Sequence, residues 1–456
     1  MLVGQDFAFI VDANTNLGDI APVYTLYGGM TCNIASGEAV DFSSPVTYTI
    51  TSHTGAKTAY TVTIRKADNI PASDADAADA VTAVINELPD PVYLNHQAQV
   101  EEAAEAYNSL TSLQKLLVEG RDKLAADQAR IKALGAPIRV TCVGDSITQG
   151  VGAGTGESYP DQMQEILGDG YDVCNAGISG SNILKSSSTT FPYWTSSEYT
   201  KGKEFQPDIV LMMLGTNDAT NRNWVESSIP NIREQFKEDY RDLIEEYKAL
   251  DSDPYIFLVL PMTCYGSGNQ DRMTNLTNDI IPALKELAEE ENVGLIDMHS
   301  FTAGHNEWFP DNLHPNAEAY GIIAEEFASY VTDYAEKAAM DTLSGLQLDG
   351  EALDGFAADT TSYTVELEAG ADLPAVTATA AYEGAEVSVA EDTEAGTVSV
   401  TVTSADERYQ QTYTIAFQRK AAYQKGDLNR DDRVNIEDVM LVCRVQIGRA
   451  SCRERV

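Results

Sequence analysis

The sequence predicts a multidomain protein in which a three-layer α/β/α domain is flanked by small β-sandwich domains and a helical module. Between residues 137 and 340, apolar strand-like runs alternate with amphipathic helices, as in a parallel sheet covered on both faces. Pairs of alternating strands near both ends of the chain indicate the β-domains. At 456 residues the chain is also too long for one ordinary domain.

The composition is that of an acidic globular protein. Apolar residues make up 43% of the chain, which is enough for several cores. Asp and Glu outnumber Lys and Arg by 71 to 30, giving a net charge of −41. This negative field disfavours nucleic acids and anionic membranes as partners. No apolar run is long enough to span a bilayer, so no membrane span is predicted.

The first residues lack the basic start and the apolar core of a signal peptide. Because the chain begins abruptly in a strand-like run at Phe7–Val11, we expect its natural N-terminus to lie further upstream. The cysteines are scattered and form no CxxC motif, so they carry no signal of a redox compartment. They are Cys32, Cys142, Cys174, Cys264, Cys443 and Cys452.

Two β-sandwich domains are predicted, over residues 1–67 and 341–421. In each, two runs of alternating polar and apolar residues flank a polar turn, the pattern of paired strands with one buried face. The runs are Val46–Ile50, Tyr60–Ile64, Val398–Val402 and Tyr413–Phe417. Both segments resemble immunoglobulin-like or cadherin-like modules. The resemblance implies attachment or spacing and no chemistry.

Residues 73–135 are predicted to form a helical module. Val81, Ile85 and Leu88 fall on one face of a helix. Thr111 and Gln114 have the spacing of a capping box ahead of a further apolar run. Nothing in the module has a catalytic pattern, so we interpret it as a packed spacer.

The α/β domain is predicted over residues 137–340, with five strands followed by a closing helix. The helix before the fourth strand has aromatic and aliphatic residues at core spacing, from Ile232 to Tyr247. The closing helix is expected to begin at Pro315, since proline is well suited to a first helical position. The predicted strands are Ile138–Val143, Tyr171–Asn175, Ile209–Leu214, Tyr255–Leu260 and Val293–Asp297.

Four short motifs follow the predicted strands or precede the last helix, and together they indicate nucleophilic catalysis. A serine hydroxyl needs a base within hydrogen-bonding reach, and Ser146 stands at a strand end, where open α/β sheets place their chemistry. His314 has a carboxylate, Asp311, three residues earlier, which can orient the imidazole ring. The motifs are Gly144–Thr148, Asn175–Gly180, Gly215–Asp218 and Asp311–Pro315.

These four motifs resemble the SGNH, or GDSL-type, hydrolase family over the α/β segment. The resemblance implies a flavodoxin-like fold, a catalytic triad of Ser146, Asp311 and His314, and no cofactor for catalysis. It also implies an oxyanion hole made of the backbone N–H groups of Ser146 and Gly180 and the side chain of Asn217. We interpret Asp145 and Gly177 as turn formers, Asp218 as a carboxylate that stabilises a loop, and the remaining histidines as structural. These are His53, His96, His299 and His305.

A calcium loop is predicted near the C-terminus, within residues 424–446. Its oxygen ligands have the spacing of a calcium-binding loop, and the segment resembles the first repeat of a dockerin. The resemblance implies a cohesin-bearing scaffold as a partner, although Asp432 replaces the usual glycine and no second repeat follows. Residues 447–456 are basic without apolar period, and we interpret them as an artefactual tail. The ligands are Asp427, Asn429, Asp431, Asp438 and the carbonyl of Arg433.

The substrate is predicted from the surroundings of the triad. The loop after the second motif is polar and contains Tyr193 and Trp194, which suit a sugar better than a lipid. We therefore predict a secreted, bacterial carbohydrate O-acetylesterase, similar to acetylxylan or sialate esterases, that acts on acetylated polysaccharide or oligosaccharide at the cell surface or in a cellulosome. The alternatives are a GDSL esterase directed at lipid or peptidoglycan and a non-catalytic polysaccharide-binding or scaffold protein.

Overall fold

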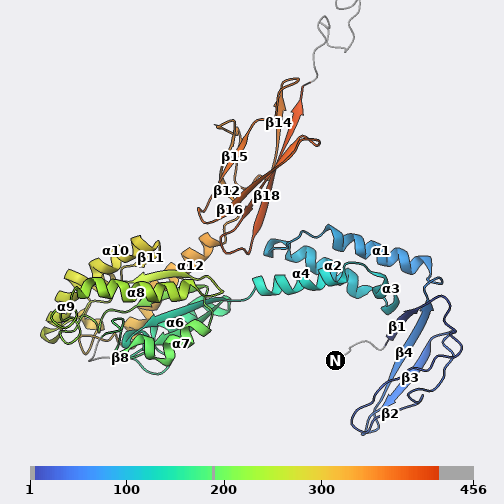
Figure 1. Cartoon of the computed structure of the whole chain (residues 1–456), viewed down its shortest axis with the longest axis horizontal. Coiled ribbons are helices and arrows are strands. Elements are labelled where there is room, and N and C mark those ends of the chain that lie inside the picture. The colour runs from blue at the N-terminus through green and yellow to red at the C-terminus, as the bar shows by residue number, and fades with distance from the viewer. Residues whose placement is uncertain (1–5, 187–190, 421–456) are drawn as a thin grey trace, which may run out of the picture. The chain divides into compact units, whose positions relative to one another are not determined.

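The computed structural model describes residues 6–186 and 191–420 (Figure 1). Residues 136–338 form one compact unit, and the segments on either side of them form a second. The predicted calcium ligands Asp427, Asn429, Asp431, Arg433 and Asp438, and the predicted tail 447–456, lie outside the described residues.

The 136–338 unit is built on a five-stranded parallel sheet with the order β11-β10-β9-β5-β6. In chain order this is the 2-1-3-4-5 arrangement of flavodoxin-like folds, whose order reverses between β5 and β9. The predicted three-layer α/β/α fold is therefore confirmed. The strands are β5 Ile138–Gly144, β6 Tyr171–Gly177, β9 Ile209–Met213, β10 Tyr255–Val259 and β11 Gly294–Ile296.

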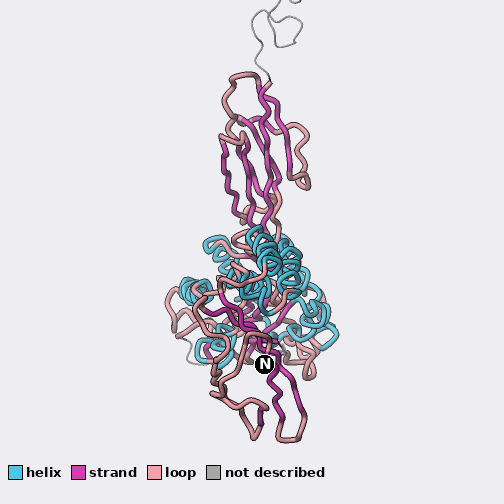
Figure 2. The backbone as a smooth tube through the Cα atoms, turned by 90° about the vertical axis from the view of Figure 1, so that its right-hand side faces the viewer, coloured by secondary structure: helices cyan, strands magenta, loops and turns pink. Residues whose placement is uncertain are grey.

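Helices cover both faces of this sheet because alternate strand residues point to opposite sides. Val210 and Met212 pack with α8 and α10, whereas Ile209 and Leu211 pack with α6 and α12. Figure 2 colours the helices cyan and the strands magenta. The helices are α5 Ser146–Gln149, α6 Tyr159–Leu167, α7 Ser197–Glu204, α8 Ile232–Lys248, α9 Gln270–Asn275, α10 Ile281–Glu291, α11 Met298–Thr302 and α12 Ala317–Ala338.

The shorter elements of this unit are β7 Ser181–Asn182 and β8 Phe191–Pro192, with turns of helix at η2 Gly168–Gly170, η3 Tyr193–Thr195, η4 Ser267–Asn269, η5 Leu276–Ile280 and η6 Asn306–Trp308.

The predicted core of α8 is present: Phe236, Tyr240 and Tyr247 are each fully buried. The closing helix α12, however, begins at Ala317 and not at Pro315. The side chain of Asn316 accepts a hydrogen bond from the N–H of Ala319 at 2.9 Å. Asparagine is a strong cap because its oxygen satisfies an N–H that the first turn leaves free, and here it outweighs the preference of proline for the first position.

The N-terminal segment contains one four-stranded sheet with the order β1-β4-β3-β2. The predicted β-sandwich would have had two sheets. The face of the observed sheet is covered by irregular chain, from which Phe42 is fully buried. Residues 12–45 are rich in Gly, Pro, Asn and Ser, which favour turns over a second sheet. The strands are β1 Asp6–Val11, β2 Thr31–Cys32, β3 Val46–Thr51 and β4 Lys57–Lys66.

Helices follow this sheet, as predicted, and the capping box is present. The N–H of Gln114 donates to Thr111 Oγ1 at 3.3 Å, and the N–H of Thr111 donates to Gln114 Oε1 at 2.9 Å. The helices are α1 Ala72–Glu87, η1 Leu94–His96, α2 Gln97–Ser109, α3 Ser112–Leu117 and α4 Arg121–Leu134.

The segment after α12 contains two sheets that pack around a shared apolar core. Their orders are β13-β12-β15 and β14-β18-β17-β16. Val398 and Val400 of β17 and Ile415 of β18 are fully buried between them. The strands are β12 Leu343–Leu348, β13 Glu351–Ala352, β14 Ser362–Leu367, β15 Val376–Ala380, β16 Glu386–Asp392, β17 Thr397–Thr403 and β18 Gln410–Arg419.

Candidate active site

Ser146 lies at the carboxyl end of β5, where the strand order of the sheet reverses. The turn is closed by Asp145, whose Oδ1 accepts the N–H of Ile147 at 3.0 Å and caps α5. Two glycines let the chain pack closely around this turn. A Cβ atom on Gly144 would lie 2.0 Å from Thr148 Oγ1, and one on Gly177 would lie 2.4 Å from the backbone nitrogen of Gln149. We interpreted Gly177 from the sequence as a turn former, but the structure shows that it allows the close approach of two backbone segments.

The structure brings Ser146, His314 and Asp311 together. Ser146 Oγ lies 2.9 Å from His314 Nε2, and His314 Nδ1 lies 2.6 Å from Asp311 Oδ2. Asp311 Oδ1 accepts the backbone N–H groups of His314 at 2.7 Å and of Leu313 at 2.9 Å. An ionised Asp311 only accepts hydrogen bonds, so Nδ1 carries the proton and Nε2 is free to accept the serine proton. This arrangement can carry out general-base activation of a nucleophile.

The three side chains differ in exposure. Ser146 is 7% exposed and the His314 side chain 14%, whereas 55% of the Asp311 side chain is exposed. Partial burial opposes the ionisation of Asp311, but hydrogen bonds from the His314 ring and from the two backbone N–H groups lower the pKa of its carboxyl. Asp311 is therefore a carboxylate at neutral pH, as orientation of the imidazole requires.

The predicted oxyanion donors come from three different strand ends. Among the hydrogen bonds of the described loops, none uses the backbone N–H of Ser146 or Gly180. Gly180 has φ +81°, and a Cβ atom there would meet nothing within 4 Å, so open space surrounds its backbone. Asn217 Nδ2 donates to the carbonyl of Ser181 at 2.9 Å and lies 3.5 Å from Asp145 Oδ2. The second contact is at the limit of a hydrogen bond and therefore holds the amide only weakly.

Asp218 stabilises a neighbouring loop, as predicted. It is fully buried and accepts the backbone N–H groups of Ile183 at 3.1 Å and Leu184 at 3.0 Å. Burial raises the pKa of Asp218 to about 7, although these hydrogen bonds oppose the rise. Burial likewise raises the pKa of Asp145 to about 6, against the hydrogen bond from Ile147. Two buried acids therefore support the loops that follow β5, β6 and β9.

The predicted substrate contact of Tyr193 is wrong, whereas that of Trp194 stays a prediction. Tyr193 is fully buried, and its hydroxyl donates to the carbonyl of Ala176 at 2.9 Å. The indole N–H of Trp194 donates to the carbonyl of Ile183 at 3.0 Å, and the Lys185 ammonium covers its ring at 4.0 Å. The polar atoms of both rings find partners within the protein and hold the loop onto the core, and Tyr193 has no exposed face for a sugar.

The other histidines are not near a nucleophile. His299 Nδ1 lies 3.1 Å from the carbonyl of Pro261, and the His305 ring stacks on Trp308 with centroids 4.0 Å apart. His96 Nδ1 accepts the backbone N–H of Tyr93 at 3.0 Å. Within residues 6–186 and 191–420, no group of three His, Cys, Asp or Glu side chains could hold a metal ion.

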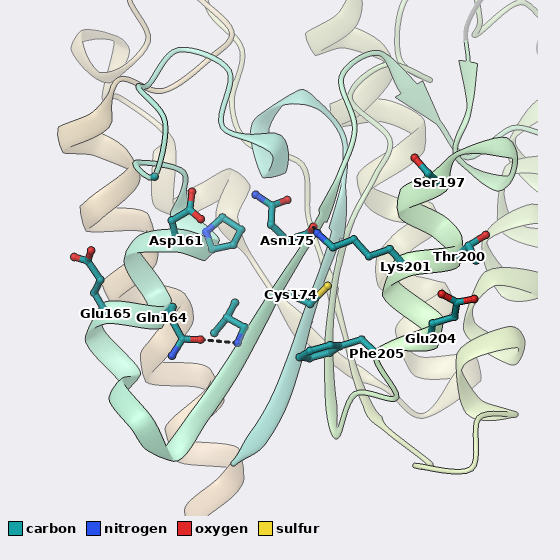
Figure 3. A pocket seen from close by; sticks show the side chains of 13 residues that line it. Asp161, Gln164, Glu165, Cys174, Asn175, Ser197, Thr200, Lys201, Glu204 and Phe205 are labelled. Carbon is teal, nitrogen blue, oxygen red and sulfur yellow. Dashed lines mark hydrogen bonds between the residues drawn. The ribbon is translucent and has the colours of Figure 1, made fainter. Parts of the chain in front are cut away.

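A groove of about 1070 Å³ lies beside the sheet, along the edge strand β6 between α6 and α7 (Figure 3). Gln164 Oε1 accepts the N–H of Val173 at 2.7 Å, and its Nε2 donates to the carbonyl of Tyr171 at 2.9 Å. Lys201 Nζ donates to the carbonyl of Asn175 at 2.8 Å. These side chains block pairing with a further strand. The groove is not lined by any residue of the triad.

Sequence reasoning missed one charged side chain near the triad, that of Arg272 on α9. It lies outside all four motifs, so no spacing pattern points to it. Only its charge in an acidic chain could have drawn attention to it.

The α/β unit matches a known protein family. Residues 142–322 match the model of the GDSL-like lipase/acylhydrolase family, and residues 5–64 match the family described as SGBP, N-terminal. No helix in the described parts of the chain is both long and apolar enough to cross a membrane.

Two curated relatives match parts of the chain. An acetylxylan esterase of Xylanibacter ruminicola is 30% identical over 235 residues, which are 46% of this chain and 47% of the relative. An exo-β-1,6-galactobiohydrolase of Bifidobacterium longum subsp. longum is 40% identical over 115 residues, 23% of this chain and 8% of that protein. The chain thus spans about half the length of the first relative and much less of the second.

Among solved structures, a carbohydrate acetylesterase family member from Sinorhizobium meliloti is 19% identical to this chain. The match covers 43% of this chain and 98% of that one, with a TM-score of 0.35.

Proposed function

We propose that this chain is a serine esterase that removes O-acetyl groups from carbohydrates, and the match of residues 142–322 to the GDSL-like lipase/acylhydrolase family supports this proposal. The observation that carries the proposal is the hydrogen-bonded relay from Ser146 Oγ through the His314 ring to Asp311. The relay supplies a nucleophile, a base and an orienting carboxylate, which is the set that acyl transfer needs. The similarity to an acetylxylan esterase supports an acetylated carbohydrate as the substrate.

In the first half of the reaction, Ser146 Oγ attacks the acetyl carbonyl carbon while His314 Nε2 takes the hydroxyl proton. The negative charge that develops on the carbonyl oxygen faces the backbone N–H groups of Ser146 and Gly180 and the side-chain amide of Asn217. As the C–O bond to the sugar breaks, His314 returns its proton to the sugar oxygen. The products are a free sugar hydroxyl and an acetyl ester on Ser146.

In the second half, water replaces the sugar. His314 Nε2 takes a proton from the water, whose oxygen attacks the acetyl carbonyl carbon, and the same donors hold the oxyanion. When the bond to Ser146 Oγ breaks, His314 gives the proton back to the serine and acetate leaves. Asp311 stays ionised throughout and stabilises the imidazolium that forms in each half.

The sequence also supports proposals about place and partners. We propose that the protein works outside the cell, because its flanking β-domains resemble immunoglobulin-like or cadherin-like modules of the kind appended to secreted bacterial enzymes. For residues 424–446 the pattern of oxygen ligands supports calcium binding and docking to a cohesin-bearing scaffold. Isothermal titration of calcium into the whole chain tests this proposal, and the absence of any heat of binding would contradict it.

The experiment that tests the esterase is a substrate panel. Acetate release from acetylated xylan is measured beside hydrolysis of 4-nitrophenyl esters from acetate to palmitate. We expect acetate release and a preference for the acetate ester, and we expect Ser146→Ala to fold normally while losing activity by a factor on the order of 10⁶. Preference for esters of long-chain acids would indicate that the substrate is a lipid and not a carbohydrate. Undiminished activity of Ser146→Ala would refute the nucleophile.

A further inference from the structure

Helix α9 bridges the two loops that carry the predicted oxyanion donor Asn217 and the base His314. On one side, Asn275 Nδ2 donates to the carbonyl of Ala219 at 2.9 Å, two residues after Asn217. On the other side, Asn269, directly before α9, donates through Nδ2 to the carbonyl of Asn312 at 3.1 Å, two residues before His314. Helix α9 is therefore held by hydrogen bonds to both loops.

One of these side chains, Arg272, is a cation without a counter-ion. Its Nη1 donates to Asn269 Oδ1 at 2.5 Å, and its Nε is buried without a hydrogen-bond partner among the described residues. None of the ion pairs in the described part of the chain includes Arg272. Acidic residues number 71 in this protein, so an unpaired and half-buried guanidinium is unexpected. Burial of a charge without a partner is costly, which points to an anion supplied from outside the protein.

Arg272 is tied to the loop of His314, because Asn269 accepts a hydrogen bond from Arg272 and itself donates to the carbonyl of Asn312. Burial raises the pKa of Asp145, the residue before Ser146, to about 6, and the positive charge of Arg272 is one of the effects that oppose this rise. The same guanidinium lies against the thiol of Cys264, where it opposes the effect of burial, which raises the pKa of that thiol to about 12. Neither group forms an ion pair with Arg272 in the described part of the chain, and Cys264 is a buried thiol.

We propose that Arg272 binds a carboxylate of the substrate, so that the preferred substrates are acetylated glycans bearing an acidic sugar. The inference rests on the proposed esterase and names its substrate class. A guanidinium presents a planar set of donors that matches a carboxylate in a bidentate pair, which no neutral side chain can do. The net charge of −41 does not decide against an acidic glycan, because salt screens distant charges beyond about 10 Å at 0.1 M and leaves the local cation dominant.

The acidic sugar has two chemical sources, a uronate branch on a plant glycan and a sialate. The experiment therefore measures kcat/KM for acetate release from acetylated xylo-oligosaccharides with and without a glucuronate branch, from O-acetylated sialic acid, and from 4-nitrophenyl acetate. The enzymes compared are the wild type, Arg272→Gln and Arg272→Lys. Arg233→Gln is the matched control, since it removes the same charge from an arginine that pairs with Glu286 on α10.

We expect Arg272→Gln to lower kcat/KM about 10- to 100-fold on one acidic substrate, the typical effect of losing a charged hydrogen-bonded pair. The neutral oligosaccharide and 4-nitrophenyl acetate should change less than about twofold. Arg272→Lys should fall between the wild type and Arg272→Gln, because it keeps the charge and loses the planar fork. Arg233→Gln should match the wild type on every substrate. The acidic substrate that responds identifies the source of the carboxylate.

A second measurement needs no variant at Arg272. Glucuronate, sialate and glucose are compared as competitive inhibitors of 4-nitrophenyl acetate hydrolysis by the wild type, and one of the acids should inhibit at least tenfold more strongly than glucose. Equal inhibition by all three, or an equal loss on all substrates in Arg272→Gln, would overturn the role of Arg272 and leave the esterase intact. Turnover of 4-nitrophenyl acetate without acetate release from any glycan would instead overturn the carbohydrate substrate.

Discussion

Replacement of Asp311 by Asn should damage the enzyme more than replacement by Ala. Asp311 Oδ1 accepts two backbone N–H groups, from Leu313 and His314. A carboxamide has a single acceptor oxygen, so these two donors fix that oxygen at the Oδ1 position and turn the NH₂ toward His314 Nδ1, which lies 2.6 Å from Oδ2. Nδ1 must then accept, the ring proton moves to Nε2, and Nε2 can no longer take the proton of Ser146.

The size of each effect follows from the same geometry. The wrong tautomer in Asp311→Asn should lower kcat by a factor on the order of 10³–10⁴, the loss seen when a triad carboxylate becomes an amide. Asp311→Ala also removes the carboxylate, but 55% of this side chain is exposed and water can reach Nδ1 in its place. We therefore expect a loss of only about 10- to 100-fold, that of a partly screened charged hydrogen bond.

The assay is kcat for 4-nitrophenyl acetate at neutral pH, with thermal unfolding as the control for folding. Asp311→Ala loses the acceptor for both backbone N–H groups, so its structural cost is the larger of the two. An Asn variant that is slower than Ala therefore isolates the tautomer. Equal rates, or a faster Asn variant, would refute the reasoning from the hydrogen bonds of Asp311.

Two further predictions concern the neighbouring loops. Asn217→Ala should lower kcat by a factor on the order of 10²–10³ with little change in KM, as loss of one oxyanion donor does; a wild-type rate would place the oxyanion elsewhere. Burial raises the pKa of Asp218 from its ordinary value of 3.8 to about 7 in the fold, so its stabilising contribution is complete below pH 3.8 and is lost as pH rises through 7. Across that window Asp218→Asn should show a flatter dependence of unfolding free energy on pH than the wild type, by up to about 4 kcal/mol, in urea titrations at steps of pH; parallel curves would contradict the raised pKa.

Much of the α/β unit could be predicted from the sequence because its signals are local. A strand buried on both faces is a continuous apolar run, as in Ile209–Met213, and a covering helix repeats its apolar residues with the helical period, as in Ile232–Lys248. The motif residues also lie at strand ends, which a parallel sheet brings to one edge. For this reason Ser146, Asp311 and His314 could be grouped although 168 residues separate the first from the last.

Other features could not be predicted because they depend on which side of a loop meets the core. Tyr193 and Trp194 stand in a polar loop without any period, and only the fold shows that their rings point inward to Ala176 and Ile183. Arg272, in contrast, was not predicted to have any role. Its sequence neighbours give no reason to expect an unpaired cation, since its isolation arises from loops that meet in space. The prediction of a second sheet in the N-terminal domain was wrong for a different reason: the chain there is rich in turn-forming residues and is mostly irregular.

The two buried acids at the site, Asp145 and Asp218, lower the stability of the folded state. Asp145 and Asp218 each have a raised pKa, and the charge of Asp145 contributes to the rise at Asp218. At neutral pH both therefore weaken the folded state, whereas an apolar pair would not. In return, Asp145 caps the turn that presents Ser146, and Asp218 ties the loop after Gly180 to the strand end that bears Asn217.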